Sequence, residues 1–397
     1  MMLPLGSPLL FDTCESLLTP DDNAGAEEPP EQRLLDRPER LAQRIAASAA
    51  AGAQAVCAPT AGACRAGLVP YKAQGRLEEI NAGLVRAAKA AAGTLPVGGV
   101  LGPSGLFVAP YGETDFDDIY SAYKDQTDVL VESGVDFLLL NRQASLADMR
   151  AALLAARHTD LPVLACISVD ETGKTLTGAN LLPVLITLQS MGAEAVGLCA
   201  PPSSEAAGEA VRRVFPHTSV PLILLADAKP GETPEALAAA AAPLLGAGSG
   251  IVGIGYDAGP SHIRALRDAM KKSGIPEIPE KPDCYAVATE QEAFFLGEDI
   301  RFSEPLHCSS LLEDNLIHLE DERVSAALVE VASVADAELL ARSASMAKLP
   351  IAVRADSKTV LEAALRYFQG RLIIDSKCMI ERKLLDPLAA KYGAVIY

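Results

Sequence analysis

The sequence predicts an α/β protein: a (β/α)8 barrel, or TIM barrel, followed by a smaller, incomplete α/β domain. Residues 8–272 alternate short apolar runs with amphipathic stretches of helical period, and they do so eight times. Most of these runs are apolar without alternation, as expected for parallel strands that are covered on both faces. Because neither a hairpin signal, a GxGxxG turn nor a P-loop interrupts this order, we expect a closed barrel and not an open doubly wound sheet.

The strand candidates lie at regular intervals along this first part of the chain. In chain order they are residues 8–15, 53–60, 95–103, 135–142, 161–170, 193–200, 220–228 and 250–257. The stretches between them carry helix signals. Pro38 precedes a run spaced Leu41, Ile45, Ala49 and marks a first helical turn.

Two further helices have recognisable ends. Residues 76–93 place Ile80, Leu84 and Ala88 on one face and end at a glycine. The triplet 233–235 (Thr-Pro-Glu) is an N-terminal signature before an Ala/Leu-rich helix. These signals predict that each strand is followed by a helix, as a barrel requires.

The predicted domains are a barrel over 1–272, a linker over 273–283 and a small α/β domain over 284–397. The linker, SGIPEIPEKPD, is rich in Pro and Glu. The last domain has strand and helix candidates in alternation but is too short for a second complete barrel. Its strand candidates are 284–290, 326–332, 349–356, 371–377 and 393–397, and its helix candidates are 334–347 and 357–369.

Composition excludes several classes of partner. Hydrophobic residues make up 49% of the 397 residues, which suffices for a large core. A formal net charge of −18 disfavours nucleic acid and anionic membrane surfaces, because both are bound mainly by Lys and Arg. The eight cysteines form no CxxC pair, and the N-terminus has no basic leader before an apolar run. We therefore expect a cytoplasmic protein with reduced thiols, no membrane span and no nucleic-acid partner.

Several phrases follow one another in an order that points to one family. They are EEINAGLVRAAKAAAG with VGGVLGPSG, then YGETDFDDIYSAYKDQTDVLVESGVDFLLL, DETGKTLTGAN (170–180), AEAVGLC (193–199) and GIVGIGYDAGPSHIRAL (250–266). Over about residues 8–272 the chain resembles the homocysteine S-methyltransferase domain, which occurs alone and as the N-terminal module of cobalamin-dependent methionine synthase. LPIAVRADSKTVLEAALRYFQGRLIIDSK (349–377) is similar to part of that enzyme's next module, the pterin-binding barrel.

The resemblance implies a methyltransferase with a zinc ion held by three thiolates, which ionises the thiol of homocysteine. The family's zinc positions match Ala200 at the end of strand six, and Gly255 with Tyr256 at the end of strand eight. None of these supplies a thiolate, so no cofactor is predicted. Cys199 is one residue away, and we expect it to point to the opposite face of its strand.

Other family positions are changed as well. The acidic residue expected to bind the substrate amino group matches Asn141, and Asp12 alone survives from an early signature. In the pterin-like part, the family's strand-end Asp matches Arg354 and a later Asn matches Asp375. Losses in both modules indicate redirected or abandoned chemistry.

The residues leave several alternatives open at the barrel mouth. Candidates for a regrouped metal site are Cys14, Cys57 and Cys199 with Glu15, Asp227, Asp257 and His262; the alternative is buried thiols that act as small hydrophobes. Asp170, Asp227 and Asp257 end strands five, seven and eight, where they could ring a ligand or cap the next helix. Tyr256 either walls a pocket or fills vacated space. The turn at 102–105 is either an anion cradle or a plain loop.

Two functional hypotheses follow. One is a non-catalytic binding or assembly protein that holds a small-molecule ligand, a corrinoid or methyl-transfer protein, or a second copy of itself. The other is a methyltransferase that acts on a small thiol or amine without the three-thiolate zinc, or with a regrouped site. The ligand-binding candidates are Asp12, Glu15, Asn141, Asp170, Cys199, Asp227, Tyr256 and Asp257.

Overall fold

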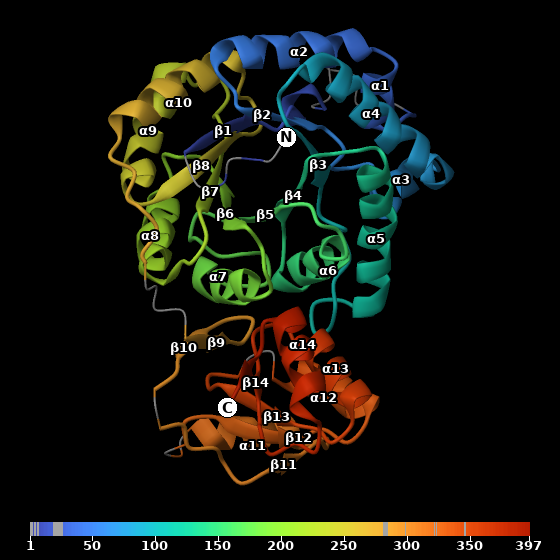
Figure 1. The fold of residues 1–397 in the computed structure, drawn as a ribbon, viewed down its shortest axis with the longest axis vertical. Helices are drawn as coiled ribbons and strands as arrows, with labels where there is room; N and C mark the ends of the chain where they lie inside the picture. Colours follow the sequence, from blue (N-terminus) through green and yellow to red (C-terminus); the bar gives the residue numbers. More distant parts are fainter. Residues whose placement is uncertain are drawn as a thin grey trace.

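A computed structural model describes residues 3, 5, 8–18, 27–280, 285–297, 299–320, 322, 324–344 and 347–397. Residues 281–283 of the predicted linker, and Cys284, lie outside these ranges. The first part of the chain is a closed barrel of eight parallel strands surrounded by helices (Figure 1), which confirms the predicted fold class.

The barrel strands pair in chain order, and β1 pairs with β8 to close the ring. They are β1 (Leu9–Asp12), β2 (Ala55–Ala58), β3 (Val97–Leu101), β4 (Phe137–Gln143), β5 (Val163–Ser168), β6 (Ala195–Ala200), β7 (Leu222–Ala226) and β8 (Ser249–Ile254). Six of the eight lie inside a predicted run, while β4 extends one residue beyond its predicted end and β8 begins one residue before its predicted start.

The helices of the barrel module pack around the strands. They are α1 (Pro30–Leu35), α2 (Pro38–Ala51), α3 (Arg65–Leu68), α4 (Leu77–Ala92), α5 (Phe116–Glu132), α6 (Leu146–Ala156), α7 (Leu181–Ser190), α8 (Glu205–Val214), α9 (Pro234–Gly246) and α10 (Pro260–Lys272). Short 3-10 turns are η1 (Glu15–Leu17), η2 (Val69–Tyr71), η3 (Gln74–Arg76) and η4 (Phe215–His217).

The helix signals in the sequence are largely confirmed. Helix α4 buries Ile80, Leu84 and Ala88 and ends at a glycine, and the N-cap of α9 is Thr233. Helix α2 differs in one position, because Ser48 and not Ala49 completes its buried face. The Ser48 hydroxyl donates a hydrogen bond to a buried carboxylate, so a polar residue is buried there.

Two phenylalanines fill the interior of the barrel. The rings of Phe11 and Phe137 lie edge to face, with centroids 6.4 Å apart. Glycines on neighbouring strands make room for them: a Cβ on Gly98 would lie 2.4 Å from the Phe137 ring, and one on Gly253 would lie 2.6 Å from the Phe11 ring. The close packing of the interior therefore requires glycine, which has no side chain, beside each phenylalanine ring.

The C-terminal part contains a hairpin and an open five-stranded parallel sheet in the order β11-β12-β13-β14-β15. Strands β10 and β11 were not predicted, and neither was the hairpin that β10 forms with β9. The elements are β9 (Ala286–Ala288), β10 (Ala293–Phe295), β11 (Leu306–His307), α11 (Leu312–Glu320), β12 (Ala327–Glu330), α12 (Val334–Ser343), β13 (Ile351–Arg354), α13 (Lys358–Tyr367), β14 (Ile373–Ile374), α14 (Arg382–Tyr392) and β15 (Val395–Ile396).

One face of this sheet packs against segments of the same chain. Leu328, Ala352 and Ile373 on the strands form a cluster with Val287 of β9 and Phe294 of β10, among others. The hairpin thus covers apolar surface that an incomplete barrel would leave open.

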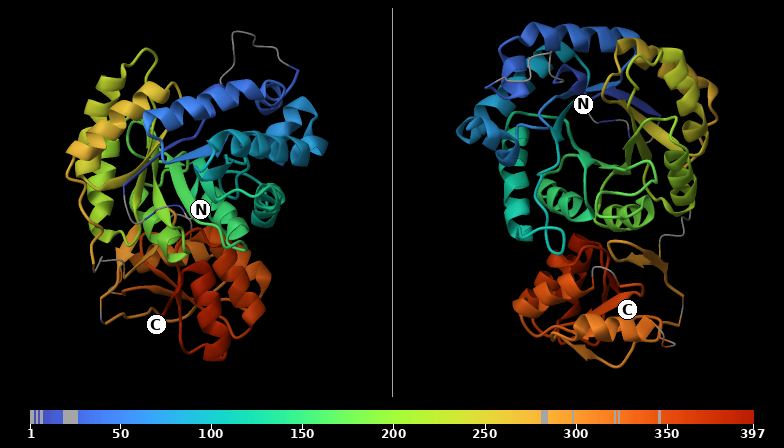
Figure 2. Two further views of the ribbon diagram at one scale, coloured as in Figure 1. Left: turned by 45° about the horizontal axis from the view of Figure 1, so that its top comes forward. Right: turned by 180° about the vertical axis from the view of Figure 1, so that it is seen from behind.

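The C-terminal part lies against one side of the barrel, beside α5, α6 and α7 (Figures 1 and 2). The Arg150 side chain on α6 is buried and donates to the carbonyls of Leu365 and Arg366 at the end of α13. Asp117 on α5 pairs with Arg366. Within the described ranges, none of the helices is both long and apolar enough to span a membrane.

Candidate functional site at the barrel mouth

The carboxyl ends of the strands bring together five polar or sulfur-bearing side chains. Glu15 follows β1, Asn141 and Arg142 lie in β4, Cys199 lies in β6 and Asp227 follows β7. They form a connected network. Because the chemistry of (β/α)8 barrels takes place at this end, the network is the candidate functional site.

Arg142 is at the centre of the network. Its Nη1 donates to Asp227 Oδ2 at 2.8 Å, its Nη2 donates to Asp227 Oδ1, and its Nε donates to Glu15 Oε2 at 3.3 Å. Its guanidinium also lies 4.1 Å from the ring centroid of Tyr256. The pairing of β4 with β5 shifts register between Leu140 and Gln143, and Arg142 takes a left-handed φ of 56°. The regular pairing of β4 with β5 is therefore interrupted at Arg142.

Glu15 is buried beneath the arginine. Its side chain is 2% exposed. Its Oε1 accepts a hydrogen bond from Asn141 Nδ2, and its Oε2 accepts one from Thr13 Oγ1 at 3.3 Å. Burial raises the pKa of the Glu15 carboxyl, the Arg142 cation opposes this increase, and the nearby Asp227 carboxylate adds to it.

Cys199 points into the barrel, contrary to the expectation from its offset of one residue. It belongs to the interior cluster with Phe11 and Cys166, and its Sγ lies 3.6 Å from Asn141 Oδ1. Ala200 instead belongs to the layer between strands and helices. The alternation of the strand is preserved, and the inward position at the mouth is residue 199. One thiol therefore reaches the candidate site.

At strand eight the backbone is crowded by the arginine network. A Cβ placed on Gly255 would lie 2.3 Å from Asp227 Oδ1 and 2.4 Å from Arg142 Nη2. The backbone N–H of Tyr256 donates to Asp227 Oδ1 at 3.0 Å, and its ring is partly exposed above Arg142. Position 255 therefore has no room for a side chain unless the ends of the Arg142 and Asp227 side chains move.

Asp12 lies outside this network. Its carboxylate accepts hydrogen bonds from Arg44 Nε at 2.6 Å, from Arg44 Nη2 at 3.1 Å and from Ser48, both on α2. Arg44 also donates to the carbonyl of Ala258. Asp12 thus ties α2 to the ends of β1 and β8, and its oxygens are turned away from the mouth.

The structure separates Asp170 and Asp257 from the network. Asp170 Oδ1 accepts bonds within its own loop, from Thr172 and from the N–H of Lys174, and the Thr172 hydroxyl lowers its pKa. Asp257 is exposed, with a left-handed φ of 55°. The alternative reading as helix caps is wrong for Asp170, Asp227 and Asp257. The N-caps of α7, α9 and α10 are Asn180, Thr233 and Gly259.

His262 links two loops. The N–H of Gly259 donates to His262 Nδ1 at 3.0 Å, so its Nε2 is left to donate to the carbonyl of Glu232 at 3.2 Å. Both ring nitrogens are therefore used within the fold. Cys14 and Cys57 are fully buried, and burial raises the pKa of both thiols. Among the residues that the structure describes, no three His, Cys, Asp or Glu side chains are arranged to hold a metal ion.

The turn at 102–105 is a closed loop. The N–H of Ser104 donates to Tyr123 Oη at 3.0 Å and to Asp148 Oδ2 at 3.2 Å, and the Ser104 hydroxyl donates to Asp148 Oδ1 at 2.7 Å. Burial raises the pKa of the Asp148 carboxyl to about 6. Because a carboxylate already accepts from this turn, an anion would find it occupied.

The strand ends of the C-terminal sheet carry a second arginine network. Arg354, at the end of β13, donates to Asp375 Oδ2 at 2.7 Å and to Glu330 Oε1 at 3.1 Å. His307 on the neighbouring strand lies 3.3 Å from Glu330. The opposite charges at these strand ends therefore pair with one another.

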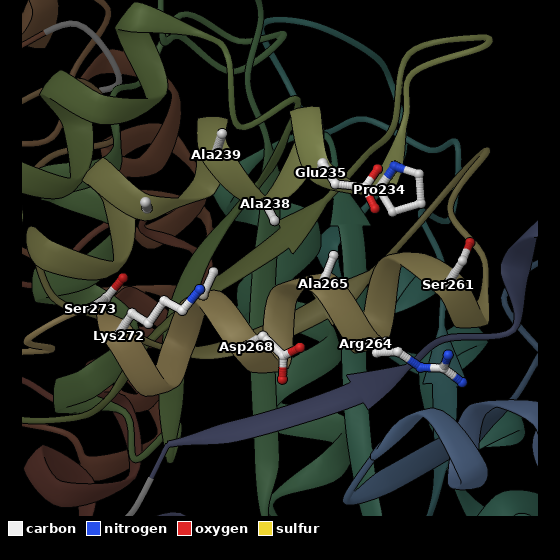
Figure 3. A pocket seen from close by; sticks show the side chains of 12 residues that line it. Pro234, Glu235, Ala238, Ala239, Ser261, Arg264, Ala265, Asp268, Lys272 and Ser273 are labelled. Carbon is white, nitrogen blue, oxygen red and sulfur yellow. The ribbon is translucent and has the colours of Figure 1, made fainter.

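A groove on the outside of the barrel lies between α9 and α10 (Figure 3). Ala238, Ala265 and other small residues form its floor, while Glu235, Arg264 and Asp268 lie at its sides. Its lining contains neither imidazole nor sulfur. It therefore offers no thiol or imidazole side chain that could bind a soft metal ion.

The family model of homocysteine S-methyltransferase matches residues 14–270, about two thirds of the chain. The chain belongs to the homocysteine S-methyltransferase family.

Two curated relatives are methionine synthases. That of Mycobacterium tuberculosis (strain ATCC 25618 / H37Rv) is 26% identical over 321 residues, which cover 70% of this chain and 26% of the relative. That of Mycobacterium leprae (strain TN) is 25% identical over 326 residues, covering 70% and 27%. The chain thus spans about a quarter of the length of these relatives.

A solved structure agrees with this family's fold. The homocysteine methyltransferase MmuM from Escherichia coli, in its metallated form, superposes with a TM-score of 0.57 at 19% identity. The match covers 66% of this chain and 96% of MmuM.

Sequence reasoning missed Arg142 in this member of the homocysteine S-methyltransferase family. The available signal was a charged residue two positions after the apolar run FLLL of β4, since arginine is rarely buried in a strand. Four of the predicted site residues do meet around it: Glu15, Asn141, Cys199 and Asp227, with the backbone and ring of Tyr256 above.

Proposed function

We propose that this protein of the homocysteine S-methyltransferase family does not catalyse zinc-dependent methylation of a thiol and acts as a non-catalytic binding or assembly protein. The observation that carries the proposal is the crowding at Gly255. Position 255 is one of the three zinc positions implied by the family resemblance. The space that its side chain would need is held by the ion pair of Arg142 and Asp227.

The residues around the mouth do not fit a three-thiolate zinc site. Cys199 supplies one inward thiol from strand six. At strand eight, Gly255 has no side chain and Tyr256 has no sulfur. A thiol substrate would therefore lack the metal that makes it a nucleophile near neutral pH.

The second module supports the same reading. At the carboxyl ends of its strands, Arg354 is paired with Asp375 and Glu330. The Asp375 side chain is 2% exposed, so its carboxylate is committed to the arginine. Polar groups that could bind a ligand are thus paired with one another in both modules.

Exposed apolar side chains support a binding role. Among the described residues of the barrel, the large apolar side chains open to solvent are Val69, Tyr111, Leu176 and Tyr256. Val69 begins η2, in the connection that follows β2, and the other three lie on loops that follow β3, β5 and β8, so all four belong to connections at the mouth end. We infer that these connections are the part of the barrel surface that contacts another molecule.

The test is a methyl-transfer assay on the purified chain with S-methyl donors and a panel of homocysteine, selenohomocysteine and related thiols. The E. coli homocysteine methyltransferase serves as positive control. We expect no turnover above the protein-free rate. Turnover of any donor–acceptor pair would overturn the non-catalytic half of the proposal. A chain that is strictly monomeric by light scattering and purifies without ligand or protein would count against the binding half.

One observation favours a second candidate, a methyltransferase with a regrouped site for a small thiol or amine. Cys199 reaches the mouth beside Asn141 and Arg142, so a single thiol is available there. If the panel does show turnover, this candidate requires that Cys199→Ser abolishes it. The matched control is Cys378→Ser, a buried thiol in the C-terminal part.

A further inference from the structure

The barrel mouth already contains a cation of its own. The two carboxylates that meet there, on Glu15 and Asp227, are 2% and 17% exposed. Two carboxylates at this depth require a positive partner, because an unpaired buried charge costs several kcal/mol. Arg142 fills that requirement from β4, and its side chain is 15% exposed.

We propose that Arg142 is the permanent occupant of the barrel mouth and that its guanidinium takes over, in charge and in place, the role of a bound metal ion. Its contacts resemble a coordination sphere: two oxygens of Asp227, one oxygen of Glu15 and, through the cation–π contact, the face of Tyr256. Cys199 lies beside this network, with its Sγ 3.6 Å from Asn141 Oδ1. The mouth is thus closed to metals by a residue of the chain itself.

The local backbone is arranged for this role. The register shift in β4 and the left-handed φ of Arg142 set this residue apart from the regular strand, and its guanidinium reaches both carboxylates. The missing side chain at Gly255 provides the space, since a Cβ there would lie 2.4 Å from Arg142 Nη2. Arginine suits the position because its planar fork satisfies both oxygens of one carboxylate and it stays charged at every relevant pH.

A consequence follows for the chain without this arginine. Its removal would leave the Glu15 and Asp227 carboxylates without their cation. As the structure describes them, these two groups and the Cys199 thiol are not arranged around a metal position, so they would have to turn toward the vacated space to bind a metal ion. A divalent ion that accepts oxygen and sulfur ligands, such as Zn²⁺ or Co²⁺, would restore the charge balance. The Cys199 thiol would lose its proton to solvent as its sulfur binds the metal. This inference deepens the proposed function and rests on it, because it states what replaced the metal.

The experiment is titration of the full-length wild-type chain and of Arg142→Ala with Co²⁺, followed by calorimetry and near-ultraviolet absorption. We expect the variant to bind one Co²⁺ per chain, at least roughly a hundred-fold more tightly than the wild type does. A thiolate-to-cobalt absorption band should accompany binding and disappear in Arg142→Ala combined with Cys199→Ser. Arg65→Ala, which removes an exposed arginine paired with Asp125, is the control for loss of charge alone.

Several outcomes would overturn the inference. They are a folded Arg142→Ala chain that binds no Co²⁺, binding without the thiolate band, or equal binding by the wild type. Arg142→Met, which keeps the aliphatic packing against Tyr256, is the second variant if the first is unstable. Aggregation of both variants in the presence of Co²⁺ also counts against the inference, because the metal should rescue them. The methyl-transfer assay on the wild type tests the proposed function separately, since it does not depend on this gain of binding.

Discussion

Single ionisable residues are buried at several points of this protein, and each is stabilised in a different way. Arg142 is paired with carboxylates, and Arg150 donates to backbone carbonyls. Glu290, at the turn of the β9–β10 hairpin, is 3% exposed and hydrogen-bonds the Thr177 side chain. Burial raises the pKa of the Glu290 carboxyl to about 7. Protonation therefore removes the buried negative charge of Glu290, whereas the ion pair with Arg142 compensates that of Glu15.

The pKa of Glu290 makes stability depend on pH. Because the folded pKa lies above the ordinary value of 4.5, the stabilising proton is fully bound below about pH 4.5 and is lost as the pH rises through about 7. Glu290→Gln imitates the protonated form. Relative to the wild type, it should be stabilised by about 3 kcal/mol at pH 8 and by less than about 1 kcal/mol at pH 5. Urea unfolding at the two pH values measures this.

The control for this prediction is Glu292→Gln in the same hairpin, where the side chain is exposed. It should change stability equally little at both pH values. If Glu290→Gln instead destabilised the chain at pH 8, the fold would prefer the ionised carboxylate, and the raised pKa of Glu290 would be wrong.

Helices and strands meet through a few specific contacts between elements. Arg150 on α6 donates to Leu365 O at 2.7 Å and Arg366 O at 3.1 Å, the carbonyls at the end of α13. A cation there also opposes the negative end of the helix dipole. Burial lowers the pKa of Arg150 to about 10, so it remains charged at neutral pH. One barrel helix thus caps one helix of the C-terminal part.

Replacing this cap should loosen the C-terminal part without unfolding the barrel. Arg150→Met keeps most of the side-chain volume but leaves the carbonyls without their donor, at a cost of about 2 to 3 kcal/mol. Hydrogen exchange should accelerate along α13 and its neighbours. Arg157→Met, at the other end of α6, is the matched control, because Arg157 donates to Met191 O within the barrel. Equal exchange in α13 for both variants would contradict the capping role.

The strands depend on glycine where aromatic rings cross the barrel. Gly98→Ala would place a Cβ 2.4 Å from the Phe137 ring, and overpacking of this kind costs about 1 to 3 kcal/mol. Combining it with Phe137→Leu should recover part of that loss, as thermal unfolding would reveal. Gly75→Ala, where no atom lies within 4 Å, should have little effect. Additive losses in the double variant would mean that the ring is not the obstacle.

At the scale of the whole molecule, the order of the strands was predictable and the connections of the site were not. The eight apolar runs sufficed for the barrel because parallel strands buried on both faces leave a strong signal. Cys199 points into the barrel, whereas the opposite direction was predicted. Neighbouring residues of a strand point to opposite faces, so an error of one residue in matching a strand to the family reverses the predicted face. The role of Arg142 depends on a register shift between Leu140 and Gln143 that the sequence does not mark.

The C-terminal part was predictable only in outline. Its helices over 334–347 and 357–369 were expected from their periodicity, and α12 and α13 lie within those ranges. The β9–β10 hairpin was missed, because its strands have three residues each and no two-residue turn signal. The covering of the sheet by that hairpin follows from contacts far apart in the chain.

The claim on which this account depends is that the mouth of the barrel is neutralised by Arg142 and holds no thiolate-bound metal. The most direct test is the zinc content per chain of the full-length protein purified from zinc-supplemented medium, measured by elemental analysis. We expect far less than one zinc per chain, and the same value for Cys199→Ser. One zinc per wild-type chain that is lost on Cys199→Ser would contradict it.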